Sequence, residues 1–378
     1  MTVDPPLYLT HTVREVSNCD ILAAVSTDVD CRDILSLIEF EELARRSMTP
    51  MAYEFVVSGA ADEHTLRWNR EAFDRIRLRP RVLRDVATVD TRVTLLGRDL
   101  AFPILLAPTA YNRVLHPEGE LETARGAGAA GATLIVSMST TTAIADIARV
   151  ATSPLWFQVY FQSDPGFTRD VIRQAEESGC EALCLTVDTP VIGARNRQAR
   201  ARFRLPPDVM TPHLYDIGHR KQEVMDPRRV PATWKDVEWV RAFTKLPVVL
   251  KGILDPEDAE IAIQSGAQAV VVSNHGGRNL DTVPASVEAL PAVVDRVHGR
   301  IPLLVDGGIL RGTDVLKSIA LGARAVLIGR PYCYALGVAG SAGVHRVVEI
   351  LRGELEAAMM LSGVSAVRSV DRSLLWDA

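Results

Sequence analysis

One short segment of the chain gathers side chains suited to acid–base chemistry. Residues 273–278 read Ser-Asn-His-Gly-Gly-Arg. The ordinary pKa of histidine lies near neutrality, so His275 suits proton abstraction at physiological pH. The two glycines let the backbone approach a ligand, and Arg278 can receive a carboxylate in its planar fork. A lone histidine is more often structural than catalytic, but this setting favours a base beside a carboxylate-binding arginine.

Two charged residues elsewhere in the chain can complete such a site. Asp188 follows an apolar run and could orient His275 and stabilise its imidazolium form, or it could simply begin a turn with Thr189 and Pro190. Arg195 follows seven residues after Asp188 and opens a basic run that extends to Arg204. Such runs are usually solvated faces, so Arg195 alone is a candidate.

Charge and glycine mark three more positions. Lys251 ends an apolar run, and a lysine is rarely buried without a partner. It could meet a ligand charge, form a Schiff base or extend its amine to solvent. Asp306-Gly307-Gly308 and Gly329-Arg330 are turns of the kind that bind phosphate. A phosphate-bearing cofactor and a carboxylate substrate with an abstractable proton would use all these groups.

The elements that must position these residues alternate regularly. Eight short runs rich in Val, Ile and Leu predict buried parallel strands. They are residues 103–107, 133–137, 155–160, 182–187, 247–251, 269–273, 301–306 and 325–329. Amphipathic stretches such as 166–178, 256–264 and 313–320 predict helices between them, and a glycine often follows the helix, where it can adopt a left-handed cap.

Eight βα units in about 230 residues predict an α/β fold of the TIM (β/α)8 barrel type. A doubly wound sheet is the rival, but it usually has fewer strands and a GxGxxG turn directly after its first strand, and no such turn directly follows residues 103–107. In a TIM barrel the chemistry lies at the carboxyl ends of the strands. The chain places a polar group at every such end, including Thr109, Ser137, Gln158 with Tyr160, Thr186 and Ser273.

The remaining segments are interpreted around that barrel. Residues 1–35 are expected to form an N-terminal extension, 36–102 a helical cap with helices near 35–46 and 50–58, and 103–378 the barrel. A long loop after strand 4, from residue 189 to about 232, is unusual in a compact domain and indicates a lid or another functional segment.

Composition excludes several classes of protein. Hydrophobic residues make up 47% and charged residues 24%, as in globular enzymes. A net charge of -5 gives no reason to expect nucleic acid or an anionic membrane as a partner, and no apolar run is long enough to span a bilayer. Five scattered cysteines indicate reduced thiols. We therefore expect a cytoplasmic protein without a metal site.

The chain resembles the FMN-dependent 2-hydroxy acid oxidase and dehydrogenase family, which includes glycolate oxidase, lactate oxidase and mandelate dehydrogenase. The resemblance runs from about residue 36 to about 370. Ser-Asn-His-Gly-Gly-Arg at 273–278 is its most specific motif. The supporting motifs occur in order at 58–60, 107–110, 116–120 (His-Pro-Glu-Gly-Glu), 185–190, 250–252, 306–308 and 328–330.

The resemblance implies FMN as cofactor and a role for each site residue. His275 would remove a proton with support from Asp188, while Tyr160, Arg195 and Arg278 bind the substrate. Lys251 would stabilise the reduced flavin at its pyrimidine edge. The other expected FMN contacts are Pro108, Thr109, Ala110, Ser137, Gln158, Thr186, Ser273, Asp306, Gly307, Gly308, Ile309, Leu310, Arg311, Gly329 and Arg330.

Three positions depart from the pattern of the family. Phe55 stands where members commonly place a tyrosine that binds the carboxylate, and one lost hydrogen bond costs about 1 kcal/mol or more. Tyr53, two residues away, could substitute. Ser139 replaces the bulky tryptophan of glycolate oxidase, which with Tyr111 predicts a roomier substrate pocket. At the phosphate loop Leu310 replaces an arginine, and Arg311 beside it could compensate.

By this resemblance we expect an oxidase that converts an (S)-2-hydroxy acid to its 2-oxo acid and reduces oxygen to hydrogen peroxide. The pocket should admit medium, long or aromatic side chains. Alternatives are a dehydrogenase that passes electrons to a quinone or cytochrome, a Lys251 Schiff-base aldolase, or a flavin-binding protein without activity. Transfer of a hydride or passage through a carbanion both remain open. The resemblance also implies a homotetramer or octamer.

Overall fold

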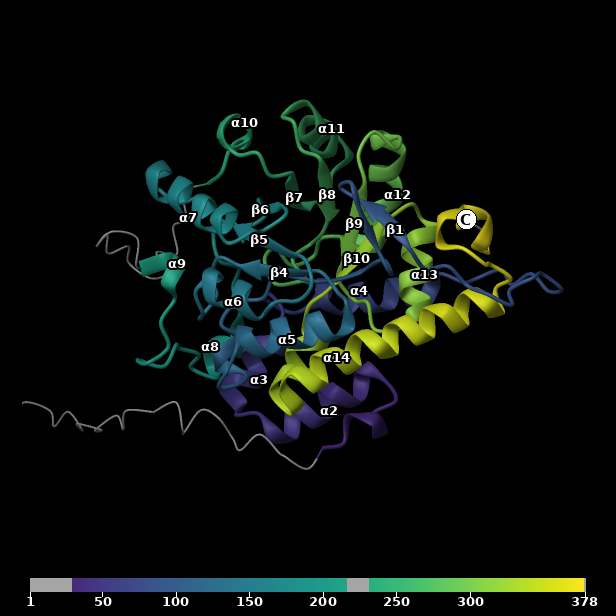
Figure 1. The fold of residues 1–378 in the computed structure, drawn as a ribbon, viewed down its shortest axis with the longest axis horizontal. Coiled ribbons are helices and arrows are strands. Elements are labelled where there is room, and N and C mark those ends of the chain that lie inside the picture. The colour runs from purple at the N-terminus through teal and green to yellow at the C-terminus, as the bar shows by residue number, and fades with distance from the viewer. Residues whose placement is uncertain (1–28, 216–230, 377–378) are drawn as a thin grey trace, which may run out of the picture.

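The computed structural model describes residues 29–215 and 231–376, and its centre is a closed barrel of eight parallel strands (Figure 1). Around the barrel the strands follow chain order, and β10 closes on β3. The bounds differ from the predicted ones by at most two residues, so the TIM barrel is confirmed. The strands are β3 (Ile104–Leu106), β4 (Leu134–Ser137), β5 (Leu155–Val159), β6 (Leu183–Thr186), β7 (Val248–Ile253), β8 (Ala269–Val272), β9 (Leu303–Asp306) and β10 (Ala325–Ile328).

Burial of both faces explains why these strands are apolar runs without polar alternation. One face fills the inside of the barrel, where Leu105, Ile135, Trp156 and Leu327 belong to one buried cluster. The other face packs against the surrounding helices and belongs to the main core. Every residue of β3 to β6 is therefore buried, as parallel strands covered on both sides require.

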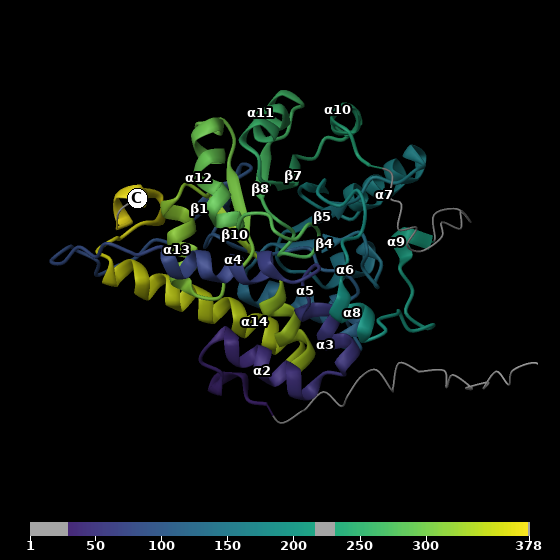
Figure 2. The ribbon, with the colours of Figure 1, turned by 180° about the vertical axis from the view of Figure 1, so that it is seen from behind.

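Helices follow the strands and surround the barrel, as the view from behind also shows (Figure 2). The predicted helices at 166–178, 256–264 and 313–320 are confirmed as α7, α11 and α13. Positive φ angles at Gly131, Gly179, Gly266 and Gly322 confirm the glycine positions that end helices. The helices are α5 (Glu120–Ala130), α6 (Ile144–Val150), α7 (Pro165–Glu177), α10 (Trp234–Phe243), α11 (Pro256–Gln264), α12 (Ser286–Val297), α13 (Gly312–Ala320) and α14 (Arg330–Leu361).

Three helices precede the barrel: α2 (Leu37–Ser47), α3 (Pro50–Val57) and α4 (His64–Arg75). Helices α2 and α3 match the predicted cap, and both pack against α14 (Figure 1). Helix α4 was not predicted. Its preceding residue, Glu63, gives no capping hydrogen bond. Instead, the Asp281 carboxylate from the barrel accepts the backbone N–H groups of Asp62, His64 and Thr65. A distant side chain thus caps this helix and joins it to the barrel.

A short antiparallel hairpin, β1 (Val93–Leu95) with β2 (Arg98–Leu100), also lies outside the predicted elements. It leads into the barrel, and Leu95 packs with the inner cluster of strand residues such as Leu105. Leu95 therefore helps to fill the interior of the barrel, so the hairpin contributes to the core.

The long connection after β6 contains α8 (Asn196–Arg200) and α9 (Pro212–Tyr215), while residues 216–230 lie outside the described ranges. His213 fixes α9 to the barrel, because its Nε2 accepts the Ile144 N–H at 2.9 Å. At the N-terminal side, residues 1–28 of the expected extension also lie outside the described ranges. The 3-10 helix η1 (Cys31–Asp33) leads to Ile34, whose carbonyl accepts two hydrogen bonds from Arg346.

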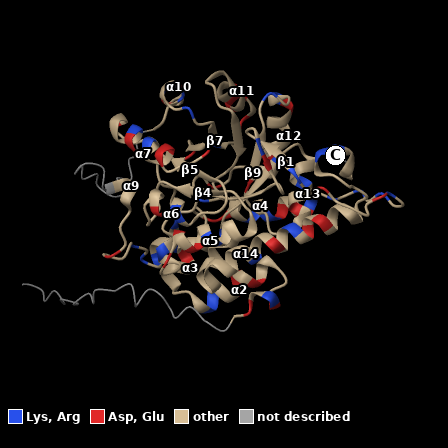
Figure 3. Cartoon of the chain, viewed as in Figure 1, with Lys and Arg blue, Asp and Glu red and all other residues tan. Residues whose placement is uncertain are grey.

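The short 3-10 helices η2 (Asn112–Val114), η3 (Val367–Ser369) and η4 (Arg372–Leu374) complete the fold. Acidic and basic residues are interspersed along the outer helices, as α14 shows (Figure 3). No helix within 29–215 and 231–376 combines the length and apolar character needed to cross a bilayer. Among the same residues, no three His, Cys, Asp or Glu side chains lie close enough together to hold a metal ion.

Candidate active site

A cavity of about 430 Å³ lies where the carboxyl ends of the barrel strands meet the cap. That volume is typical of sites for small ligands. The carboxyl-end position is where TIM barrels carry their chemistry. Nineteen of the predicted site residues line it: Phe55, Pro108, Thr109, Ala110, Ser137, Ser139, Tyr160, Thr186, Arg195, Lys251, His275, Arg278, Asp306, Gly307, Gly308, Ile309, Leu310, Gly329 and Arg330.

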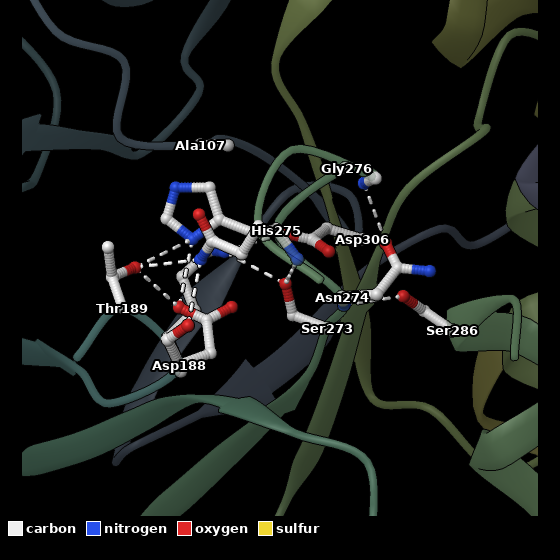
Figure 4. Close-up of polar contacts among 12 residues, drawn as sticks. Ala107, Asp188, Thr189, Ser273, Asn274, His275, Gly276, Ser286 and Asp306 are labelled. Atoms are coloured by element: carbon white, nitrogen blue, oxygen red, sulfur yellow. Dashed lines mark hydrogen bonds and ion pairs between the residues drawn. The ribbon is translucent and has the colours of Figure 1, made fainter. Parts of the chain in front are cut away.

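His275 and Asp188 form a hydrogen-bonded pair at the wall of this cavity. The His275 Nδ1 lies 2.9 Å from the Asp188 Oδ1, and Thr189 Oγ1 lies 3.5 Å from the same nitrogen (Figure 4). The other ring nitrogen points away from Asp188 (Figure 4). Burial lowers the pKa of His275 below its ordinary value, although Asp188 opposes that effect. The pair therefore presents a neutral imidazole whose imidazolium form has a carboxylate beside it.

The backbone holds His275 in an uncommon conformation. Its φ is 58°, in the left-handed region that only glycine adopts freely. The N–H of His275 donates to Ser273 Oγ at 3.0 Å. The next anchor is Asn274, whose side-chain amide exchanges two hydrogen bonds with that of Asn69 on α4, at 3.0 and 2.8 Å. The cap therefore helps to fix the segment that carries the histidine.

Lys251 lies in the cavity wall as a buried cation with two polar partners. Its Nζ is 2.8 Å from Asp306 Oδ2 and donates to Ser273 Oγ at 2.9 Å. Burial alone would lower the pKa of this amine, but Asp306 and Asp188 outweigh burial and raise the pKa above its ordinary value. Lys251 is thus held protonated, with a positive charge facing the cavity.

Two arginines bring further positive charge to the cavity without a carboxylate partner. Arg278 donates to the carbonyl oxygens of Ser58 and Val56, and Arg330 donates to those of Val56, Ser58 and Gly276. Within the described part of the chain, neither forms an ion pair. Burial and the neighbouring arginines hold the pKa of Arg278 well below its usual value. A buried pocket with such unbalanced charge favours anionic ligands.

Aromatic rings line the side of the cavity near Phe55. Phe203 from the loop after β6 stacks on Phe55 with centroids 4.5 Å apart and an interplanar angle of 13°. Tyr111 lies 5.8 Å from Phe55 and 6.3 Å from Phe203. The small Ser139 side chain also lines the cavity. Tyr53 does not line the cavity but stacks on Tyr334, so its hydroxyl does not substitute for the one missing at Phe55.

The expectation that Arg311 compensates for Leu310 is wrong. Leu310 lines the cavity, but the Arg311 guanidinium lies outside and pairs with Glu354 at 2.9 Å. The backbone N–H groups of Leu310 and Arg311 are capped by the carboxylate of Asp314. This capping begins α13 and directs Arg311 away from the cavity. The positive charges that line the cavity at this end are therefore those of Arg330, at the start of α14, and of Arg70, which is paired with Asp314.

Three predicted residues lie behind the cavity wall rather than in it: Asp188, Gln158 and Ser273. The Gln158 Oε1 accepts from Ser137 Oγ at 2.9 Å. Gln158 Nε2, Asp306 Oδ1 and Asp188 Oδ2 are among the buried polar atoms that have no hydrogen-bond partner. Buried polar atoms are rarely left unpaired. An unpaired donor and an unpaired acceptor at this site thus indicate that a polar ligand completes it.

Among the residues that sequence reasoning missed are Phe203 in the cavity wall and two residues that support the segments around the cavity, Asn69 and Glu120. Phe203 lies in irregular backbone, where no hydrophobic period marks it. Asn69 lies on α4, a helix that was not predicted. Glu120 belongs to the His-Pro-Glu-Gly-Glu motif, which was recognised without a role. For Glu120 alone the sequence therefore contained a usable signal.

The fold and site together define an α/β-barrel enzyme with a buried His–Asp pair and a cavity lined by positively charged side chains. The chain belongs to the FMN-dependent dehydrogenase family, whose pattern it matches over residues 44–377. It is similar to an L-lactate oxidase of Nostoc sp., with 44% identity over 90% of this chain and 98% of the relative. A glycolate oxidase of Spinacia oleracea is 40% identical over 91% of this chain and 97% of the relative.

Solved structures agree with these relatives. The crystal structure of mandelate oxidase with (S)-2-phenylpropionate has 42% identity and a TM-score of 0.84, covering 91% of this chain and 98% of the other. A mandelate oxidase variant with (S)-mandelic acid has the same identity, TM-score and coverage. At these identities the likeness extends to the family and not to the fold alone.

The residues in and directly behind the cavity wall fit FMN. The unpaired Gln158 Nε2 and Asp306 Oδ1 offer a donor and an acceptor, and Lys251 offers a fixed positive charge. Glycine-rich backbone at 307–308 and the start of α14 at Gly329 and Arg330 suit a phosphate, because helix N-termini and turns of this kind present free N–H groups. FMN is the cofactor of this family, and the cavity contains the chemical groups to hold it.

Proposed function

We propose that this protein oxidises an (S)-2-hydroxy acid to the corresponding 2-oxo acid and passes the electrons to oxygen, producing hydrogen peroxide. The observation that carries the proposal is the His275–Asp188 pair, 2.9 Å apart, in a cavity that also presents Arg278. A 2-hydroxy acid needs both a base and a receptor for its carboxylate. The relatives described above are an L-lactate oxidase and a glycolate oxidase.

The substrate would bind at the side of the cavity that carries the positively charged arginines. Arg278 would bind the carboxylate, since no carboxylate of the described residues neutralises it, and Arg195 would contribute from the loop after β6. Arg195 Nε donates to the Arg278 carbonyl at 3.3 Å, which ties the two arginines together. Tyr160 lines the same cavity and would donate its hydroxyl. These contacts would place the substrate α-carbon and hydroxyl beside His275.

His275 would act as the base. Its Nδ1–H donates to Asp188, which leaves Nε2 with its lone pair to accept a proton from the substrate. As the imidazolium forms, the carboxylate of Asp188 stabilises the new charge. FMN, when bound, would supply the acceptor for the two electrons and the second hydrogen that leave the substrate. The proton on Nε2 would then be released, so that oxygen can take up two electrons and two protons as hydrogen peroxide.

The surroundings of Lys251 favour the proposed oxidation over the chemistry of a Schiff-base aldolase. An aldolase lysine must lose its proton to attack a carbonyl, and burial or a neighbouring cation usually lowers its pKa. Here Asp306 and Asp188 raise the pKa of Lys251 instead. A permanently charged amine suits the stabilisation of negative charge on a reduced cofactor. The Schiff-base aldolase is therefore the weaker alternative.

The substrate side chain is proposed to be large and apolar, with aromatic acids such as mandelate favoured. Phe55, Phe203 and Tyr111 form an aromatic wall, and Ser139 leaves space where a bulky residue would close the pocket. Offset and tilted aromatic contacts with a phenyl ring add about 0.5–1.5 kcal/mol beyond burial. Mandelate oxidase structures with (S)-mandelic acid lend support, since that protein has the same fold at 42% identity.

The test is an anaerobic half-reaction followed by admission of air. The FMN-loaded protein is mixed with glycolate, lactate, 2-hydroxyoctanoate or mandelate, and the flavin absorbance is followed. We expect bleaching that is fastest with mandelate, then recovery of the absorbance with one peroxide formed per substrate oxidised. If none of these acids bleaches the flavin, the proposed reaction is wrong.

The same experiment separates the alternatives. A dehydrogenase would keep its flavin reduced in air and reoxidise it with a soluble quinone or cytochrome c. An aldolase would be trapped on Lys251 by borohydride in the presence of a carbonyl substrate, with the flavin unchanged. The residue roles given above, the division at residues 35 and 102, a cytoplasmic location and a tetrameric or octameric assembly are parts of this proposal.

A further inference from the structure

The motif at residues 116–120 has no part in the reaction proposed above, yet its last residue is buried. Glu120 begins α5 and is only 4% exposed. A buried carboxylate is costly unless hydrogen bonds satisfy it. Glu120 does not line the cavity, so neither FMN nor substrate satisfies it. Its partners come from two loops of the protein.

Each oxygen of the Glu120 carboxylate accepts two hydrogen bonds. Oε1 accepts the backbone N–H groups of Asn112 at 3.0 Å and Thr141 at 2.8 Å. Oε2 accepts the hydroxyls of Thr141 at 2.6 Å and Thr142 at 3.0 Å. Asn112 belongs to the loop after β3 and the two threonines to the loop after β4. One carboxylate therefore bridges these two loops.

Both loops carry residues of the aromatic end of the cavity, next to the residues that Glu120 holds. Tyr111 directly precedes Asn112, and Ser139 lies two residues before Thr141. Tyr111 has a φ of 57°, so the loop must hold it in the left-handed region. Its N–H donates to the Ser139 carbonyl at 3.1 Å, which joins the two loops at the cavity itself.

We propose that Glu120 is a positioning residue that sets the separation of Tyr111 and Ser139 and thereby selects the substrate side chain. This inference rests on the proposed function. Without the carboxylate, two backbone N–H groups lose their buried acceptor, and the loops separate to reach water. Tyr111 then leaves the aromatic wall. A substrate with a phenyl side chain loses its contact, whereas glycolate, which has no side chain, does not.

The pattern of donors makes two substitutions differ sharply. In Glu120→Gln the amide oxygen can keep both backbone N–H bonds, and the threonine hydroxyls can rotate to accept from the amide nitrogen. Glu120→Leu fills similar space but accepts nothing. Glu122→Leu is the matched control: Glu122 lies on the same helix and binds Ser341 N and Arg125, away from the cavity.

The experiment measures kcat and KM of the FMN-loaded variants with (S)-mandelate and glycolate, with flavin content and Tm as checks. We expect Glu120→Leu to lower the mandelate-to-glycolate ratio of kcat/KM at least tenfold, mainly through the KM of mandelate. Glu120→Gln and Glu122→Leu should keep the ratio within about twofold of wild type. A merely structural role would lower both activities and the Tm together and leave the ratio unchanged.

The inference is overturned if Glu120→Leu binds FMN and keeps the wild-type ratio. Should that variant fail to fold, Thr142→Val serves in its place, because it removes one donor to Oε2 and retains the shape. Its ratio should fall about threefold, and an unchanged ratio would also overturn the inference. A wild-type protein that oxidises none of the acids refutes the proposed function instead, so the two failures are distinguishable.

Discussion

Replacement of Asp188 by Asn tests the acid–base pair most directly. The substitution preserves shape, because Asn has nearly the same size as Asp. Asp188 Oδ1 receives the His275 contact, while Oδ2 is buried without a hydrogen-bond partner, so the new NH2 group would break no hydrogen bond at that position. The amide oxygen can therefore still accept the Nδ1–H. What disappears is the negative charge that stabilises the imidazolium as His275 takes the proton.

The size of this effect follows from the geometry. Two unit charges 2.9 Å apart attract by about 6 kcal/mol at an effective dielectric constant of about 20. That attraction corresponds to a factor of about 10⁴ in rate at about 1.4 kcal/mol per tenfold. The retained hydrogen bond recovers part of it, so we expect flavin reduction to slow by about 10³-fold. The KM of the substrate should change little, because Arg278 and Arg195 are untouched.

The pH dependence of the rate tests the same pair independently, because the direction of its shift can be predicted. The proposed mechanism needs neutral His275, so the rate should rise with pH through the pKa of His275 and then level off. Burial places that pKa below the ordinary value of 6.5. Asp188 opposes the effect of burial, so its loss lowers the pKa further. In Asp188→Asn the rising limb should therefore move to lower pH while the plateau falls.

Anaerobic stopped-flow measurement of flavin bleaching with a saturating substrate separates this step from reaction with oxygen. Asp255→Asn is the control, since Asp255 caps α11 at the surface and Asn caps equally well. Reduction by Asp188→Asn within tenfold of wild type, or a limb that moves to higher pH, would show that the reasoning about the pair is incorrect.

Four other substitutions, one of them a control, give quantitative expectations. Phe203→Ala should raise the KM of mandelate about tenfold and leave that of glycolate within twofold, because only the aromatic contact of about 1–1.5 kcal/mol is lost; steady-state kinetics would decide. Asp281→Ala removes the acceptor of three N–H groups at α4 and should lower the free energy of unfolding by about 2 kcal/mol in urea titrations. Arg330→Met should weaken FMN binding at least tenfold but not riboflavin binding, and Arg311→Met should alter neither; a weaker Arg311→Met complex would contradict the outward position of that residue.

The barrel and most of its cavity could be predicted because both depend on local pattern. Buried parallel strands are apolar on both faces, so eight short runs of Val, Ile and Leu identify them. In such a barrel, the residue after each run must face the same end. Lys251, His275 and Asp306, which are far apart in the chain, were brought to one cavity by that rule.

Features that depend on distant partners could not be predicted. Helix α4 has no local cap, because Asp281, more than 200 residues away, supplies it. The direction of Arg311 follows from the capping of α13 by Asp314 and from Glu354 on α14, and proximity to Leu310 in the sequence does not reveal either. Phe203 reaches the site from irregular backbone, which lacks the hydrophobic periodicity that identifies helices and strands in a sequence.

The reciprocal amide pair between Asn69 and Asn274 has a consequence for how the protein is made. The two residues are 205 positions apart, and contacts of such separation form late because a long loop must close first. During synthesis the cap leaves the ribosome early, and Asn69 cannot form its hydrogen bonds until residues 273–278 have also been made. His275 can thus reach its position only after about three quarters of the chain has left the ribosome. FMN would then bind only after nearly all of the chain has been synthesised and folded.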